Sequence, residues 1–294
     1  MGEALRPTTW EAFIGQDRLK DRLELHIDAA KRRDELLGHL LLVGPPGSGK
    51  TSLATLVAKE LETDFLPYMM PVKLKMIQKV LMNFEGVLFL DEIHRLSKKD
   101  QEWFLSVLED GYFQTESGTK FPLPGHLTVI GATTEPEKII KPLYDRFVLK
   151  PAFEEYTDDQ MAEIVSQLAA RLDLYITEED AMALGKASAG IPRQARNIVW
   201  TARDAGTTEP DIVLPICGIT EDGLTENHMH YLKAIDHLGM TAGIDLLSNY
   251  LRLPKDILLD VERLLIKRKF ITYSAKGRVL TLAGHQKMQP KKVK

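Results

Sequence analysis

Cysteine is nearly absent from this sequence. Cys217 is the only one among 294 residues, so an internal disulfide bond is excluded. The class of small secreted domains that disulfides hold together is excluded with it, and we expect a cytoplasmic protein by default.

Long hydrophobic runs are also missing. The longest apolar stretches are interrupted within six or seven residues, whereas a membrane helix needs roughly 18. Residues 1–10 contain no apolar segment of the signal-peptide kind. We find no internal repeat and no low-complexity tract. The overall content, 44% hydrophobic and 27% charged, is ordinary for globular proteins and predicts two or three domains with no membrane span.

Charge is unevenly distributed along the chain. Residues 224–294 hold 13 Lys and Arg against six Asp and Glu, whereas residues 1–223 hold 25 against 36. A basic carboxyl-terminal module on an acidic body favours a polyanionic partner such as nucleic acid. The tail 291–294, Lys-Lys-Val-Lys, explains part of the excess without any partner.

Short apolar runs alternate with helical patterns in the first half of the chain. Runs at 39–43, 86–90 and 127–130 are too short for helices and read as buried strands of a parallel sheet. Residues 52–61 place apolar side chains at helical spacing, which predicts an amphipathic helix. We therefore predict a doubly wound α/β domain over residues 1–151.

The remainder of the chain predicts two further domains. The first covers residues 152–222, in which 157–205 read as helices only, with Thr157 and Thr177 as N-caps, and 207–222 form a loop-rich boundary. Residues 223–294 show three helical patterns followed by two short strands around Ala275-Lys-Gly, and then the basic tail. Three helices and a β-hairpin in this order are the layout of a winged helix.

A phosphate-binding loop follows the first strand and precedes the amphipathic helix. Its glycines allow backbone N–H groups to surround phosphate oxygens at a helix N-terminus. Lys50 is predicted to reach the β- and γ-phosphates, and the Thr51 hydroxyl to hold Mg²⁺. The loop comprises Gly44, Pro45, Pro46, Gly47, Ser48, Gly49, Lys50 and Thr51.

Two carboxylates end the second strand, forty residues after this loop. Asp91 is predicted to bind Mg²⁺ together with Thr51, and Glu92 to polarise the water that attacks ATP. The third strand ends in Thr133 and Thr134, whose hydroxyls either sense the γ-phosphate or cap the next turn.

Two arginines complete the predicted site. Arg146, in Pro-Leu-Tyr-Asp-Arg-Phe, is either an arginine finger that stabilises transition-state charge or the partner of Asp145 in a surface ion pair. Arg193, in Gly-Ile-Pro-Arg, opens a helix in the all-helical segment, from which it can reach the same phosphate.

Together these residues resemble the AAA+ ATPases and, within them, the RuvB family of Holliday-junction branch-migration motors. The resemblance runs from Arg6 to about Met288. It implies an AAA+ fold with an α/β P-loop core, a helical lid and a winged helix, a hexameric ring, and a function in moving junction DNA. It also assigns an adenine-side segment, a second motif, a sensor 1, an arginine finger and a sensor 2. The matching residues are Arg6, Pro7, Phe13 and Ile14; Leu90 to Leu96; Gly131 to Thr134; Arg146; and Pro192 with Arg193.

Some segments depart from this family's pattern. Tyr144 stands where an arginine is usual, and residues 64–85 and 206–218 diverge. The wing sequence Ser274-Ala-Lys276-Gly-Arg278 nonetheless resembles the family's, and we predict that Lys276 and Arg278 contact DNA phosphates. The alternative is a solvated hairpin with incidental charges. By the same resemblance, Tyr112–His126 is predicted to be a protruding hairpin that docks a RuvA-like junction-binding protein. Phe113 and Phe121 are either exposed, as an apolar contact patch, or packed onto the body of the domain as ordinary core.

Three functions remain open from the sequence. The first is an ATP-dependent DNA motor. The second is a loader or initiator switch, in which ATP binding arranges a protein–DNA complex and hydrolysis resets it. The third is a partner-dependent ATPase whose basic module binds protein or RNA. The His94-Arg95-Leu96 extension and the wing sequence favour the motor.

Overall fold

The computed structural model describes residues 5–115, 118–123, 125–239 and 241–288. It falls into two compact units. The first comprises residues 1–156 with 191–193, and the second comprises 157–190 with 194–294. Each is described here by itself. The lysine-rich tail at 291–294, Met240, and residues 116, 117 and 124 of the predicted hairpin lie outside the described residues.

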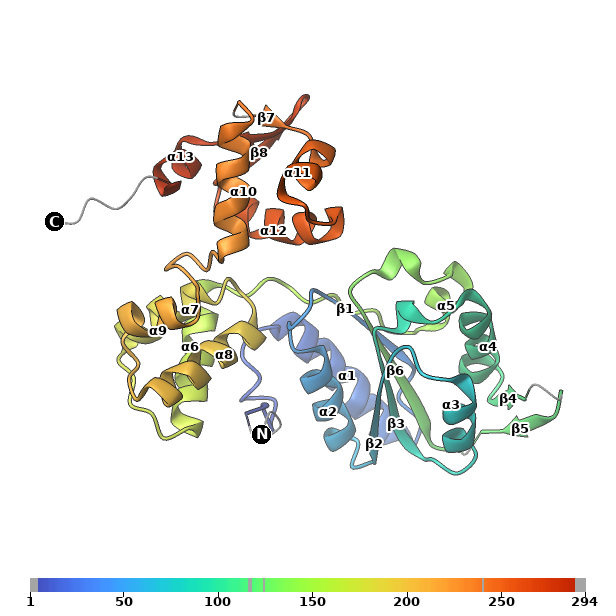
Figure 1. The fold of residues 1–294 in the computed structure, drawn as a ribbon. Coiled ribbons are helices and arrows are strands. Elements are labelled where there is room, and N and C mark those ends of the chain that lie inside the picture. Colours follow the sequence, from blue (N-terminus) through green and yellow to red (C-terminus); the bar gives the residue numbers. More distant parts are fainter. Residues whose placement is uncertain (1–4, 116–117, 124, 240, 289–294) are drawn as a thin grey trace. The chain divides into compact units, whose positions relative to one another are not determined.

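A parallel four-stranded sheet forms the centre of the first unit (Figure 1). Its order is β1-β6-β3-β2, and bridges from Leu40 to Leu149 and from Val43 to Ala152 extend it beyond β1. The predicted doubly wound α/β fold is confirmed. The strands are β1 (Leu40–Val43), β2 (Phe65–Met69), β3 (Gly86–Asp91) and β6 (Leu127–Thr133).

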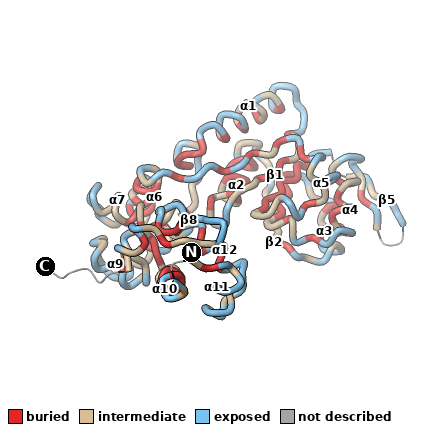
Figure 2. Tube along the Cα trace, turned by 90° about the horizontal axis from the view of Figure 1, so that it is seen from above, coloured by how far each residue is buried: buried red, intermediate tan, exposed pale blue. Residues whose placement is uncertain are grey.

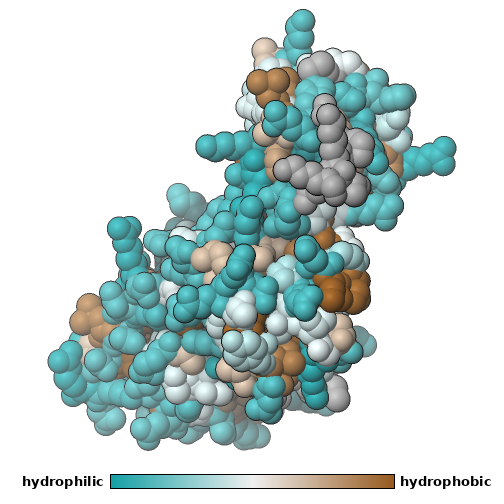
Figure 3. Space-filling model, turned by 90° about the vertical axis from the view of Figure 1, so that its left-hand side faces the viewer, coloured by the Kyte–Doolittle hydropathy of each residue, from teal (hydrophilic) through white to brown (hydrophobic). Residues whose placement is uncertain are grey.

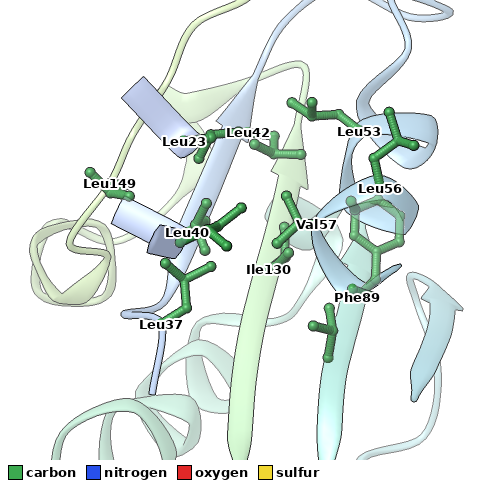
Figure 4. Close-up of a cluster of buried hydrophobic side chains, with 14 of the residues drawn as sticks. Leu23, Leu37, Leu40, Leu42, Leu53, Leu56, Val57, Phe89, Ile130 and Leu149 are labelled. Atoms are coloured by element: carbon green, nitrogen blue, oxygen red, sulfur yellow. The ribbon is translucent and has the colours of Figure 1, made fainter. Parts of the chain in front are cut away.

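Alternate side chains of these strands pack into two cores on opposite faces of the sheet. Leu40 and Leu42 belong to a core with α1 and α2, whereas Leu41 belongs to the other, with α3, α4 and α5. Figure 4 shows the first core, where side chains from β1, β3 and β6 meet those of α2. In Figure 2 the buried residues follow the strands, and the outer side of α1 is exposed. The helices are α1 (Asp17–Arg33), α2 (Lys50–Glu60), α3 (Leu74–Leu81), α4 (Lys98–Glu109) and α5 (Lys141–Arg146), with short turns η1 (Ile93–Arg95) and η2 (Pro136–Lys138).

The strand β2 escaped prediction because its sequence lacks a strand pattern. It reads Phe-Leu-Pro-Tyr-Met and is only half-buried. Pro67 is tolerated there because β2 lies at the edge of the sheet, where one side of the strand needs no hydrogen-bond donor.

Helices make up the first part of the second unit. Thr157 caps α6 by accepting a hydrogen bond from the Gln160 N–H at 3.1 Å, and Thr177 caps α7 in the same way through Asp180. Both predicted caps are confirmed. The loop predicted at 207–222 is wrong in part, because Pro210 at the first helical position starts a short helix there. The helices are α6 (Asp158–Arg171), α7 (Glu178–Ala187), α8 (Pro192–Ala205) and α9 (Pro210–Ile216).

A winged helix follows in the same unit, as predicted. Its helices enclose one hydrophobic core with the β8–β9 hairpin, to which β7 adds a third strand. Arg268 joins this module to the helices before it, donating to the carbonyls of Lys186 at 2.7 Å and Asp222 at 3.2 Å. The elements are α10 (Glu226–His237), β7 (Thr241–Ala242), α11 (Ile244–Leu251), α12 (Lys255–Lys267), β8 (Ile271–Ser274), β9 (Gly277–Leu280) and α13 (Leu282–Met288).

Within the described part of the chain, no helix is both long and apolar enough to cross a membrane. On the face drawn in Figure 3, hydrophobic side chains form separate patches among hydrophilic ones.

Candidate functional site

The predicted phosphate loop connects the end of β1 to the start of α2. Gly47 and Gly49 have φ angles of 77° and 108°, in the region that side chains rarely adopt. Space is short as well, since a Cβ on Gly47 would lie 2.9 Å from the Cβ of Arg193. Glycine is therefore needed at both turns, which directly precede the N-terminus of α2, where backbone N–H groups favour an anion.

Lys50 lies at the first position of α2 with its ammonium group turned back into the loop. Its Nζ donates to the carbonyls of Gly44 at 2.8 Å and Pro45 at 3.0 Å, and only 6% of the residue is exposed. Burial lowers the pKa of Lys50, while the carboxylates of Glu92 and Asp91 act in the opposite direction. The two carbonyls hold the ammonium group inside the loop, where a bound phosphate could replace them as its hydrogen-bond acceptor.

The acidic pair ends β3 at the same edge of the sheet. Burial raises the pKa of Asp91, and repulsion from Glu92 adds to the shift, while Lys50 opposes it. Glu92 has a φ of 54°, a left-handed conformation that is uncommon for a residue with a side chain. Such strain is found where the surrounding structure imposes it, often at functional sites.

Two threonines at the end of β6 lie beside these carboxylates. Thr134 Oγ1 donates to Glu92 Oε2 at 3.1 Å. Thr133 is fully buried, and its Oγ1 lies 3.0 Å from Nδ1 of His94. The Gly44 N–H donates to the Thr133 carbonyl at 3.2 Å, which joins the end of β6 to the loop. The residues predicted to bind phosphate, metal and water are thus brought together.

These residues fit a magnesium nucleotide. Ser48 Oγ is buried and has no hydrogen-bond partner among the described residues, so it is available to an incoming oxygen. The hydroxyl of Thr51 and the carboxylate of Asp91 supply the oxygen ligands that Mg²⁺ prefers. The roles assigned to these residues stay predictions.

The predicted adenine-side residues divide into two pairs. The Phe13 ring lies against the loop, 3.2 Å from where a Cβ on Gly49 would be, and Ile14 is buried next to it in the chain. Arg6 and Pro7 precede Thr8, whose carbonyl accepts a hydrogen bond from Lys59 at the far end of α2. The structure therefore places Phe13 at the loop, and the other pair in a segment attached to the opposite end of the helix.

The two predicted arginines have different surroundings. Arg193, at the second position of α8, donates its backbone N–H to the Gly47 carbonyl at 3.4 Å. Its charge adds to the lowering of the Lys50 pKa that burial causes, and it partly offsets the rise of the Asp91 pKa. Arg146, at the end of α5, forms a 2.7 Å ion pair with Glu109 of α4. The ion pair with Asp145, one of the two alternatives for Arg146, is replaced by this one, because α4 and α5 pack side by side.

The wing places its two cations differently. Lys276 is exposed in the turn between β8 and β9. Arg278 is 15% exposed and donates to both oxygens of the buried Glu262, at 2.8 and 3.1 Å. It also stacks on Tyr273. Glu262 therefore competes with DNA phosphates for Arg278, a pairing that the sequence did not predict.

The predicted hairpin is present as β4 (Tyr112–Gln114) and β5 (Lys120–Pro122), and it extends away from the sheet (Figure 1). Of the two alternatives for Phe113 and Phe121, exposure is wrong and packing onto the domain is confirmed. Phe113 is fully buried in the core with Trp103, and Phe121 is half-buried and stacked on it at 5.4 Å. Directly paired residues project to the same face, so the two rings cover each other.

Comparison with known proteins identifies the family. The model for the Holliday junction DNA helicase RuvB P-loop domain matches residues 5–153, slightly more than half of the chain. The model for the RuvB C-terminal winged helix domain matches residues 221–289. The chain belongs to the RuvB family. It is a P-loop ATPase with an AAA+ fold, and it binds nucleotide.

Relatives in this family match nearly the whole chain. The RuvB subunit of the Holliday junction branch migration complex from Helicobacter pylori is 33% identical over 304 residues, which covers 96% of this chain and 90% of that protein. The RuvB subunit of Helicobacter acinonychis has the same values.

Solved structures agree with this assignment. The Thermotoga maritima RuvB Holliday junction branch migration motor is 32% identical, with a TM-score of 0.82, and the match covers 98% of this chain and 99% of that one. The NtrX protein of Brucella abortus, at 18% identity and a TM-score of 0.55, shares the fold alone.

Sequence reasoning missed three residues of these RuvB-family sites. His94 was noted as part of a motif, without a role, and Glu135 was not singled out. In the structure His94 lies beside Glu92, and Glu135 lies on the other side of the His94 ring. Glu262 was missed because a lone glutamate in a helical pattern reads as a solvated position. The Tyr273 and Arg278 that surround it are more than ten residues away in the sequence.

Proposed function

We propose that this chain is an ATP-dependent DNA motor of the Holliday-junction branch-migration type, which hydrolyses ATP with Mg²⁺ in a ring of subunits. The observation that carries the proposal is the presence, in one RuvB-family chain, of an assembled P-loop ATPase site and a winged helix with a basic surplus. The relatives it matches over 96% of its length are named as branch migration subunits.

The proposal assigns a part of the chain to each task. Residues 1–151 bind and hydrolyse ATP, residues 152–222 form a helical lid, and residues 223–294 bind DNA. Lys50, Thr51 and Asp91 hold the magnesium nucleotide, and Glu92 orients water. Thr133, Thr134 and Arg193 respond to the γ-phosphate. Arg146 acts on the neighbouring subunit of a hexamer, as a site shared across a ring interface requires.

The hairpin at 112–126 is proposed to dock a RuvA-like junction-binding protein in the cytoplasm. Gln114, Thr119, Lys120 and Pro122 are exposed on it. Because Phe113 and Phe121 pack inward, such a contact rests on these polar and backbone groups rather than on an aromatic patch.

The test compares ATPase rates with no DNA, with linear duplex and with a four-way junction, together with a strand-exchange assay on the junction. Stimulation by junction DNA accompanied by strand exchange supports the motor. Stimulation that requires a sliding clamp or an origin complex, without strand exchange, contradicts it and supports the loader or initiator switch.

A further inference from the structure

The side chain of Glu92 is held by two residues from different segments. Thr134 Oγ1 donates to its Oε2 at 3.1 Å, and Nδ1 of His94 lies 3.2 Å from the same oxygen. Oε1 takes no part in these two contacts. With a proton on Nδ1, His94 and Thr134 both donate to Oε2, and Oε1 is left for a water molecule.

His94 is itself held from three sides. Its Nδ1 lies 3.0 Å from Thr133 Oγ1, and its Nε2 lies 3.0 Å from Glu135 Oε2. The Glu135 N–H also donates to Thr133 Oγ1 at 3.0 Å. These contacts link Glu92, His94, Thr133, Thr134 and Glu135 in one hydrogen-bond circuit. The imidazole side chain is only 8% exposed. A ring with partners on both nitrogens and almost no solvent contact has one orientation.

The circuit joins the end of β3 to the end of β6. Glu92 and His94 follow β3, whereas Thr133, Thr134 and Glu135 lie at and after the end of β6. Glu92 has a left-handed backbone, and its side chain reaches Thr134 at the end of β6. Such a conformation is strained for a residue with a side chain, so the contacts that hold it have to compensate.

We propose that His94 is a positioning residue for hydrolysis. Oriented by Glu135 and Thr133, its imidazole fixes the carboxylate of Glu92 so that Oε1 faces the attacking water. His94 acts through Glu92 and does not touch the nucleotide. The inference deepens the ATPase part of the proposed function and is independent of what the ATPase drives.

The first test measures basal hydrolysis without DNA. His94→Ala is expected to lower the single-turnover rate about 10- to 100-fold, since a small misplacement of a reacting group has an effect of this size. The Kd for ATP should change less than about twofold, because the phosphate contacts remain. His26→Ala, on α1, is the matched control and should leave both values unchanged. An unchanged or increased rate in His94→Ala overturns the proposal.

Two isosteric variants separate the ring nitrogens. Asn places a polar atom near the position of Nδ1, whereas Gln places one near Nε2. Because the grip on Glu92 is through Nδ1, His94→Asn should recover part of the rate and His94→Gln should not. Recovery by Gln alone overturns the assignment. These variants also serve if His94→Ala fails to fold.

A double-mutant comparison asks whether His94 acts through Glu92. If it does, Glu92→Gln combined with His94→Ala should be no slower than Glu92→Gln alone. Multiplied losses would mean that His94 acts elsewhere, and would overturn the proposal.

A readout without nucleotide completes the experiment. In protein labelled with ¹⁵N-histidine, the His94 ring signals are identified by their absence in His94→Asn. Glu135→Gln should move mainly the Nε2 signal, and Glu92→Gln mainly the Nδ1 signal. Unmoved signals in both variants overturn the circuit. If basal hydrolysis follows these expectations but DNA does not stimulate it, the positioning role of His94 is supported and the proposed DNA motor is contradicted.

Discussion

Two charged residues near the phosphate loop have different surroundings. Lys50 is buried with its ammonium group on two loop carbonyls, a position that suits phosphate binding. Glu92 lies beyond the loop, with its carboxylate directed to the end of β6. The two side chains are therefore expected to separate binding from turnover.

Lys50→Ala should impair nucleotide binding and hydrolysis together, because it removes the cation from the phosphates. Glu92→Gln should leave binding within about twofold and lower turnover by about 100-fold or more, because an amide polarises water poorly. Nucleotide titration and single-turnover hydrolysis measure the two effects. Normal turnover in Glu92→Gln would remove Glu92 from the mechanism.

Arg146 is expected to act on ATP bound by the neighbouring subunit. Arg146→Ala should bind ATP normally and hydrolyse it about 10³-fold more slowly. Mixed with Lys50→Ala protein, it should regain partial activity, since each variant supplies the half-site that the other lacks. Glu109→Ala is the control for the ion pair seen here, and it should retain hydrolysis. Mixed rings that form without any recovery would count against a shared site.

At the scale of elements, the wing hairpin is attached to α12 by a buried ion pair. Burial raises the pKa of Glu262, but hydrogen bonds from Arg278, Tyr231 and Tyr273 outweigh it, so the pKa lies below its ordinary value of 4.5. A carboxyl group with a depressed pKa contributes stability above the unfolded-state value, and this contribution is lost as the pH falls through the folded-state value.

Glu262→Gln should therefore destabilise the winged helix by about 3–5 kcal/mol at pH 7, as removal of one partner of a buried pair does. The difference in unfolding free energy between the variant and the unmodified protein should shrink as the pH falls below 4.5. Urea unfolding at several pH values measures it, and Glu226→Gln, whose side chain is 84% exposed, is the control. A difference that stays constant down to pH 3 would show that the carboxylate is not the source.

For the whole molecule, the distribution of charge separates two tasks. The acidic surplus lies in residues 1–223 and the basic surplus in residues 224–294. An acidic body disfavours unspecific attachment to DNA, whereas a basic module attracts the phosphate backbone. DNA affinity is therefore expected to reside in the carboxyl-terminal module and to fall steeply with salt.

Lys276→Ala should lower DNA affinity and reduce the slope of log affinity against log salt by about one, as the loss of one phosphate contact does. Because Lys276 is exposed, its replacement should not change the melting temperature. Binding to duplexes of unrelated sequence over a salt series measures the effect, with Lys31→Ala on α1 as the control. An unchanged affinity and slope would show that the turn of the wing does not contact DNA.

Much of this architecture follows from short stretches of sequence. The phosphate loop, the helix after it, the caps Thr157 and Thr177, and the strands of the wing are each specified by residues within a few positions of one another. Glycine conformation, capping and periodicity are local properties, so they can be recognised without the fold. The AAA+ class and the family follow from the order of such motifs.

The pairings that give individual side chains their tasks required the tertiary structure. Arg146 pairs with Glu109, Arg278 with Glu262, and His94 with Glu135, and in each pair the two residues come from different parts of the chain. Phe113 is buried although its hairpin extends outward, and β2 is a strand despite its proline. These outcomes depend on which segments the packed cores bring within a few ångströms. Distances between side chains from different elements cannot be read from residue types and their spacing along the chain. Only the tertiary structure therefore decides which charged side chains form pairs.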